Sequence, residues 1–235
     1  MKAFILAGGE GTRLRPITYE IPKPLIPVHK KAILSHLVEL FERHGVDHFL
    51  ISINAKHAAD FEKWRAGEHA HQNIEFIIEN SSLGTFGSLY LAKPHLSSES
   101  FFMSNGDELK GFDLAPMLSH HRAHKPIATL GLINVDDPHH YGVAVCDGPR
   151  IERFLEKPEN PPASTISCGL YLMDPKVFDH YPHPDARFAM VEQDLFPKLV
   201  EKKMLHGYTL EGQWYDCGTL ERWEKAIHEW KGLPS

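Results

Sequence analysis

The sequence has few cysteines, no surplus of basic residues and no long apolar run. Its three cysteines, Cys146, Cys168 and Cys217, are odd in number and form no C-x-x-C pair, which indicates reduced thiols rather than a disulfide framework. Lysine and arginine total 25 against 31 acidic residues, a formal charge of −6. This balance argues against binding to nucleic acid or to a membrane surface, because both need a basic face. No apolar stretch approaches the ~18 residues of a membrane span, and the apolar part of the N-terminus is too short for a secretory signal, so we expect a cytoplasmic protein.

The composition that is present is that of an ordinary globular protein, with 42% hydrophobic and 24% charged residues in a chain of 235. A chain of this length buries roughly 70% of its unfolded surface and needs no disulfide or metal for stability. Histidine is the exception, with 17 residues that include His120, His121 and His124. None of them has the spacing of an H-E-x-x-H or zinc-finger motif, so we expect solvated surface histidines that bind no metal.

Apolar runs alternate with segments of helical spacing along most of the chain. We expect strands at 3–7, 49–53, 74–78, 101–103, 127–133 and 166–173, and helices at 33–41, 84–93, 191–202 and 219–230. Tyr141–Phe154 departs from this rhythm, because two strand-like runs flank Asp147-Gly148, a hairpin-turn sequence. The order predicts an α/β fold, a single Rossmann-like, doubly wound mixed sheet with antiparallel strands added in the second half. We expect one domain over residues 1–235, with no C-terminal left-handed β-helix.

A glycine-rich loop, Gly8–Pro16, follows the first expected strand. Glycines at such a position let backbone N–H groups approach phosphate oxygens. Leu14 stands where the dinucleotide fingerprint has its third glycine, and no G-K-[ST] of a P-loop is present. Arg13 and Arg15 are suited to pairing with phosphate. The alternative is a tight turn whose arginines face solvent.

A second segment, Ile21–Pro27, holds three prolines and one lysine, Lys23. Prolines on both sides stiffen the backbone, so that the ammonium group can be aimed in a fixed direction. The alternative is a proline-rich loop with a solvated lysine.

Together these segments resemble the sugar-1-phosphate nucleotidylyltransferases, whose fold is the nucleotide-diphospho-sugar transferase type. Gly8–Thr18 matches the family signature G-G-x-G-T-R-L-x-P-x-T, and Pro22-Lys23-Pro24 matches the P-K-P that follows it. The resemblance covers nearly the whole chain, because later family motifs match in the same order at Leu83–Gly87, Asn105–Asp107, Tyr141–Val143, Glu156–Pro158 and Trp214–Thr219.

The resemblance implies a role for each matching residue. The catalytic residues are Arg13, Lys23, Asp107 and Asp216, and the two aspartates also hold Mg²⁺, a hard ion that prefers oxygen ligands. The nucleotide is bound by Leu6, Ala7, Gly8, Gly9, Gly11, Thr12, Arg13, Lys23, Glu79, Gly84, Asn105 and Gly106. The sugar phosphate is bound by Gly142, Glu156, Lys157, Gly169 and Glu192. Pro158 is expected to restrict the backbone of Lys157 to extended geometry and so to hold the lysine in place.

Two departures from the family pattern bear on the substrate pockets. Phe86 replaces a residue that is usually small, so we expect a reshaped base or ribose pocket. Ser167-Cys168-Gly169 stands where the family usually has N-A-G, so we expect one altered contact to a sugar hydroxyl.

The implied activity is transfer of a nucleotidyl group from a nucleoside triphosphate to a sugar 1-phosphate, with release of pyrophosphate. Glu192–Pro197 and the short chain favour guanylyl transfer to a mannose- or heptose-type 1-phosphate. Uridylyl or thymidylyl transfer is the alternative within the family, and a glycosyltransferase or a non-catalytic nucleotide-sugar sensor is the alternative outside it. Expected partners are these two small substrates, with no nucleic acid or membrane, in a monomer or small homo-oligomer.

Overall fold

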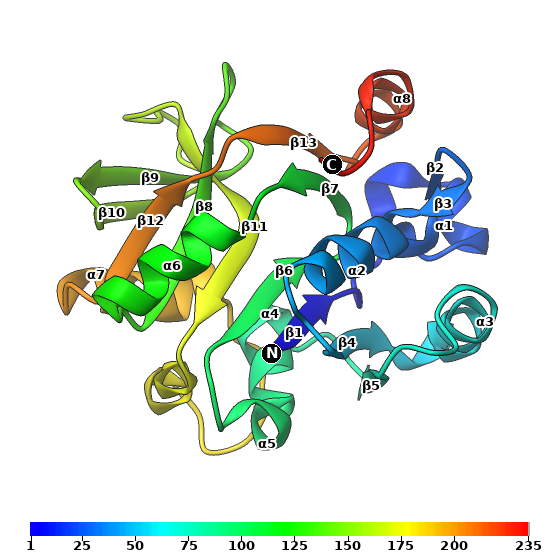
Figure 1. Cartoon of the computed structure of the whole chain (residues 1–235), viewed down its shortest axis with the longest axis horizontal. Coiled ribbons are helices and arrows are strands. Elements are labelled where there is room, and N and C mark those ends of the chain that lie inside the picture. The colour runs from blue at the N-terminus through cyan, green and yellow to red at the C-terminus, as the bar shows by residue number, and fades with distance from the viewer. Residues whose placement is uncertain (235) are drawn as a thin grey trace. The chain divides into compact units, whose positions relative to one another are not determined.

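The computed structural model describes residues 1–234, and its helices and strands fall into two units that each combine separate stretches of the chain (Figure 1). The first unit contains Met1–Ser82, Ser104–Asp113 and the described residues from Gly212 onward. The second contains Leu83–Met103 and Leu114–Glu211. The expectation of one domain stays a prediction.

Parallel strands form the sheet of the first unit. β1 (Lys2–Leu6) pairs with β4 (His48–Asn54), and β4 pairs with β5 (Ile74–Glu79). The connections between them carry α2 (Ile33–Arg43) and α3 (Ala58–Glu68). The central residues of β1 and β4 are buried, as expected for parallel strands covered on both faces. The predicted alternation of strands and helices is confirmed here.

A second group of elements in the first unit surrounds the glycine-rich and proline-rich segments. They are η1 (Thr12–Leu14), α1 (Ile17–Glu20), η2 (Lys23–Leu25), the β2–β3 hairpin (Pro27–Val28, Lys31–Ala32), β7 (Glu108–Phe112), β13 (Gly212–Asp216) and α8 (Leu220–Glu229). β7 and β13 form an antiparallel ribbon. Leu14, Leu109, Cys217 and Trp230 belong to one buried apolar cluster beneath these elements. This shared core fixes the two loops relative to the ribbon.

Five strands of the second unit pair in the order β11-β8-β12-β10-β9. β8 (Ala128–Asn134) is parallel to β12 (Leu205–Thr209) and antiparallel to β11 (Thr165–Met173). β9 (Gly142–Asp147) and β10 (Arg150–Glu156) form the predicted hairpin, with Gly148 at φ +57° in the turn. β9 also pairs with β11 at one position, so the pairings form a closed ring. The antiparallel strands predicted for the second half are therefore confirmed.

Helices and short turns complete the second unit. They are α4 (Gly84–Leu91), α5 (Lys93–Leu96), α6 (Ala115–His124), η4 (Pro175–His180), the π-turn η5 (Val191–Leu195) and α7 (Phe196–Glu201). β6 (Phe101–Asn105) begins in this unit and contributes its last two residues to the first. No helix among residues 1–234 has the length and apolar character that crossing a membrane requires.

Two expectations about local structure are wrong, and one helix is shorter than expected. The helix expected at 84–93 ends at Leu91, and Pro94 lies in the first turn of the separate α5, where a missing N–H costs nothing. The helix predicted at 191–202 opens with a π-turn instead of an α-helical one. Four histidines expected at the surface are buried: His36, His69, His121 and His206.

Candidate active site

The glycine-rich loop connects β1 to η1, and two side chains hold it in place. Gly11 has φ +59°, and a Cβ there would lie 2.8 Å from Cγ2 of Thr18, so the site requires glycine. The Thr18 hydroxyl donates to the Gly11 carbonyl at 2.9 Å, while Leu14 is buried in the core. Arg13, between these anchors, is exposed. The loop thus presents Gly9 and Arg13 to solvent on a fixed backbone.

Lys23 lies between the two predicted metal ligands. Its Nζ is 2.5 Å from Oδ2 of Asp107 and 3.9 Å from Oδ1 of Asp216. Burial alone would lower the pKa of Lys23, because it favours the neutral amine. The negative charges of Asp107 and Asp216 have the larger combined effect, so the pKa of Lys23 is raised. Burial likewise opposes the charge on Asp107, but Lys23 lowers the pKa of this carboxyl below its usual range. Both members of the pair are therefore charged at neutral pH.

Two arginines also lie at Asp216. Arg222 Nη1 is 2.5 Å from Asp216 Oδ2. A Cβ at Gly218 would lie 2.7 Å from Asp216 Oδ1 and 3.1 Å from Arg13 Nη2, so Gly218 leaves room for the carboxylate and the Arg13 guanidinium. The structure thus brings the four predicted catalytic residues, Arg13, Lys23, Asp107 and Asp216, into one cluster of charges. Sequence reasoning missed Arg222, which lies in no recognised motif.

A buried ion pair supports the corner that carries Asp107. Lys110 Nζ is 2.8 Å from Glu108 Oε2, and the indole N–H of Trp214 donates to the same oxygen at 3.2 Å. The Asn105 side-chain amide donates to Glu108 Oε1 at 3.0 Å. These bonds fix the turn between β6 and β7 from both sides. Glu108 and Lys110 were not predicted, because a Glu-Leu-Lys alternation is also typical of a solvent-facing strand.

The remaining nucleotide candidates of the first unit lie at the carboxyl ends of the parallel strands. The Gly106 N–H donates to the Leu6 carbonyl at 2.8 Å, and the Ala7 N–H donates to the Ser52 carbonyl at 2.8 Å. The Ser52 hydroxyl donates to the carboxylate of Glu79, which is buried. A Cβ on Gly8 would lie 3.1 Å from that carboxylate. This edge of a parallel sheet is where α/β proteins bind ligands.

Gly84, which is also predicted to bind the nucleotide, belongs to the second unit. It has φ +69°, and a Cβ there would lie 2.5 Å from the Ala189 carbonyl. That carbonyl accepts bonds from the backbone N–H groups of Phe86 and Gly87 at 2.8 and 3.1 Å. The start of α4 is therefore tied to the segment that leads to Glu192.

Glu192 lies at the start of η5 and faces α4. Thr85 donates its hydroxyl to Glu192 Oε2 at 2.7 Å and accepts the Val191 N–H at 2.9 Å. Burial raises the pKa of Glu192, and the Thr85 hydrogen bond offsets part of this effect. The Thr85 hydroxyl thus fixes the position of the Glu192 carboxyl group beside α4.

Lys157 differs from the prediction. Its φ is +46°, in the left-handed region and not in the extended region expected before Pro158, and its side chain is 64% exposed. It pairs with Glu156 at 2.9 Å. The proline therefore does not hold the lysine in extended geometry as predicted, and the exposed ammonium lies just after β10, paired with Glu156. Gly142 lies opposite Glu156 in the β9–β10 ladder.

The two departures from the family pattern have different outcomes. Phe86 is fully buried and packs edge-on against Tyr181, with ring centroids 4.9 Å apart, so its ring fills the core of the second unit. Ser167, Cys168 and Gly169 lie where β11 shifts register against β8, with Gly169 at φ +62°. A bulge of this kind turns a strand's side chains locally. Any effect of these residues on the substrate pockets stays a prediction.

Comparison with known protein sequences shows the family of the chain. A sequence model described as nucleotidyl transferase matches residues 2–231. A mannose-1-phosphate guanyltransferase of Schizosaccharomyces pombe is 37% identical over 224 residues, and a mannose-1-phosphate guanylyltransferase of Mycobacterium tuberculosis is 35% identical over 222. Each alignment covers 93% of this chain and 61% of the relative, so the chain spans less than two thirds of these proteins.

Solved structures resemble the chain over nearly its full length. A structure titled as a putative glucose-1-phosphate thymidylyltransferase from Bacillus anthracis, in complex with a sucrose, has a TM-score of 0.91 at 27% identity and covers 100% of this chain and 97% of its own. HddC from Yersinia pseudotuberculosis complexed with GMP-PN has a TM-score of 0.82 at 27% identity and covers 98% and 99%. These likenesses confirm the predicted α/β fold with a mixed sheet.

Proposed function

Because the chain belongs to the nucleotidyl transferase family, we propose that it transfers a nucleotidyl group from a nucleoside triphosphate to a sugar 1-phosphate. A phosphate oxygen of the sugar 1-phosphate attacks the α-phosphorus, the bond from that phosphorus to the bridging oxygen of the β-phosphate breaks, and pyrophosphate leaves. The nucleophile is already an anion, so no general base is required. Catalysis is then positioning and neutralisation of charge. The observation that carries the proposal is the buried Lys23 ammonium between Asp107 and Asp216, next to the glycine-rich loop.

The residues present fit a divalent metal ion. Asp107 and Asp216 already converge on one cationic group, the Lys23 ammonium, and carboxylate oxygens are the ligands that Mg²⁺ prefers. We propose that these two aspartates hold Mg²⁺, which would neutralise phosphate oxygens when bound. Lys23 would then turn from the carboxylates toward the α-phosphate, and the exposed Arg13 would bind the outer phosphates of the triphosphate.

The sugar phosphate would be recognised by residues of the second unit. Glu192, held by Thr85, accepts hydrogen bonds from sugar hydroxyls, and the exposed Lys157 neutralises the phosphate. Both substrates are polyanions, so a cation at each phosphate lowers the repulsion when they meet. This division assigns the triphosphate and the sugar phosphate to different residues, which separate variants can test.

We propose GTP and a mannose-type 1-phosphate as the preferred pair. The support is that relatives 35% and 37% identical are named mannose-1-phosphate guanylyltransferases. Thymidylyl transfer is the second candidate, because a structure with a TM-score of 0.91 is titled as a thymidylyltransferase. Retention of Lys23, Asp107 and Asp216 disfavours a non-catalytic sensor, and Asn105-Gly106-Asp107 in place of a D-x-D disfavours a glycosyltransferase.

A substrate matrix tests the proposal. The chain is mixed, in the presence of Mg²⁺, with each of the common nucleoside triphosphates and with several sugar 1-phosphates, and pyrophosphate is measured. GTP with mannose 1-phosphate should give the fastest release. A faster pair containing dTTP or UTP would replace the substrate assignment while keeping the reaction. No release from any pair would overturn nucleotidyl transfer itself.

A further inference from the structure

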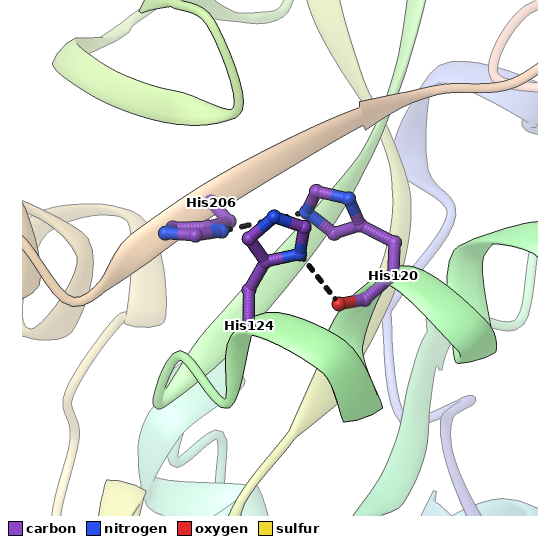
Figure 2. Close-up of side chains that lie close together, drawn as sticks. All are labelled: His120, His124 and His206. Atoms are coloured by element: carbon purple, nitrogen blue, oxygen red, sulfur yellow. Dashed lines mark hydrogen bonds between the residues drawn. The ribbon is translucent and has the colours of Figure 1, made fainter.

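Three histidines of the second unit lie together, and none of them belongs to the residues assigned to either substrate or to Mg²⁺. His120 and His124 are one turn apart at the end of α6, and His206 lies on β12. Figure 2 shows the three rings pointing toward one another from the helix and the strand. The His120 and His124 rings stack with centroids 4.3 Å apart, and each of these centroids lies within 5.6 Å of that of His206.

The ring nitrogens have the spacing of metal ligands. One nitrogen from each ring lies within 4.8 Å of the other two. His206 Nδ1 and His120 Nε2 share a hydrogen bond of 3.4 Å, so the ring that donates it would bind a metal ion in its other tautomer. In a tetrahedral zinc site, with Zn–N bonds of about 2.0–2.1 Å, neighbouring ligand nitrogens are about 3.3 Å apart. His120 and His206 are therefore already at ligand separation. His124 is exposed, and a small shift of its ring would bring its nitrogen to the same separation.

The hydrogen bond of His124 leaves the required nitrogen available. Its Nδ1 is 3.0 Å from the carbonyl oxygen of His120 (Figure 2). A carbonyl only accepts, so Nδ1 carries the proton and Nε2 has the lone pair. Metal-binding histidines are commonly fixed in this way, with one ring nitrogen donating to a backbone carbonyl and the other bound to the ion.

The cluster is also chemically selective. All three donors are imidazole nitrogens, a set that suits Zn²⁺ and similar transition-metal ions and not Mg²⁺. The aspartates proposed to hold Mg²⁺ offer carboxylate oxygens instead. Ions of the zinc class would therefore favour the three histidines, and Mg²⁺ would favour the aspartates.

We propose that His120, His124 and His206 bind one transition-metal ion of the zinc class. His120 and His124 bind through Nε2 and His206 through Nδ1, and a fourth position is open to water on the exposed side of His124. Such an ion would fasten the last turn of α6 to β12. The proposal is independent of the nucleotidyl-transfer assignment, since it uses none of its residues.

Zinc titration of the untagged, metal-stripped chain tests the site. A competing chromogenic chelator should report one equivalent of Zn²⁺ bound. Loss of outer partners of a ligand alone typically costs 10–100-fold in metal affinity, so His124→Ala, which removes a ligand, should cost at least about 100-fold. His140→Ala, which removes an exposed histidine of the same unit, should leave the affinity unchanged. Equal binding by wild type and His124→Ala, or no stoichiometric binding by wild type, would overturn the proposal.

Cobalt substitution gives a second readout. Bound Co²⁺ should show the strong visible absorption of a four-coordinate site, and excess Mg²⁺ should not displace it. The absorption should disappear in His124→Ala while the far-ultraviolet circular dichroism of that variant stays that of the wild type. A weak six-coordinate spectrum, or displacement by Mg²⁺, would contradict an all-histidine site.

Discussion

Lys23 is buried and charged at the same time, because two carboxylates face its ammonium group. An unpaired charge in such a place would be costly, so each member of the Lys23, Asp107 and Asp216 cluster depends on the others. Arg222 and Arg13 extend the cluster on the side of Asp216. The arrangement therefore places positively charged side chains next to a glycine-rich loop, as binding of a polyphosphate requires.

Removing either carboxylate should abolish most of the activity. Asp107→Asn and Asp216→Asn keep the side-chain shape but remove a preorganised charge, so each should lower kcat by roughly 100-fold or more. Steady-state pyrophosphate release checks this, with Asp137→Asn, an exposed aspartate paired with His139, as the matched control. A variant of Asp107 or Asp216 with the kcat of the control would remove that residue from the site.

Lys157 should affect one substrate only. Its side chain is 64% exposed and it contacts Glu156, so Lys157→Ala should fold normally. We expect weaker binding of the sugar 1-phosphate with unchanged binding of the triphosphate, each measured separately by calorimetry. Lys176→Ala, which removes another exposed lysine of the second unit, is the control. Equal losses for both substrates would mean that Lys157 has no selective role.

Glu192 should lower the stability of the folded protein at alkaline pH while contributing to ligand binding. Burial raises its pKa in the folded protein, so the folded state holds its proton more tightly than the unfolded chain does. The resulting stability is complete below the unfolded pKa of about 4.3 and is lost as the pH rises through the folded value. Glu192→Gln, which cannot ionise, should therefore raise Tm at pH 8, leave it nearly unchanged at pH 4, and weaken binding of the sugar 1-phosphate. A lower Tm at pH 8 would contradict this account.

At the scale of elements, the sequence predicts best where burial is apolar and continuous. The parallel strands β1 and β4 were predicted for that reason. The β7–β13 ribbon was missed, because β7 buries the charged pair Glu108 and Lys110 inside an otherwise short apolar stretch. Only the fold brings Trp214 and Asn105 to Glu108, so no local pattern indicates that these charges are paired. Arg222 was missed for the same reason.

The start of α4 should tolerate no side chain at Gly84. Alanine there would adopt a left-handed backbone and also place Cβ 2.5 Å from the Ala189 carbonyl. Gly148 has a similar φ, +57°, with nothing within 4 Å of its Cβ position. Gly148→Ala should therefore cost only the backbone term, about 1–2 kcal/mol. Gly84→Ala should cost clearly more in urea unfolding, and equal losses would mean that the contact with Ala189 is unimportant.

At the scale of the whole molecule, each unit carries one set of candidate residues. Most of the nucleotide and metal candidates lie in the first unit, and the sugar-phosphate candidates lie in the second. The order of motifs along the sequence predicted both sets, whereas the division of the chain into two interleaved units was not predicted. The chain passes between the units at four places, and one of these lies inside β6, between Met103 and Ser104. No composition shift marks this point, so sequence alone gives no signal for it.

The most direct test of the central claim is a phosphorus NMR time course of the chain with GTP, mannose 1-phosphate and Mg²⁺. We predict that the monoester signal of the sugar phosphate disappears while a nucleotide-sugar diphosphate and pyrophosphate appear in equal amounts. Consumption of GTP with the sugar phosphate unchanged would mean hydrolysis and not transfer. Unchanged spectra with every triphosphate and sugar 1-phosphate tried would contradict nucleotidyl transfer by this chain.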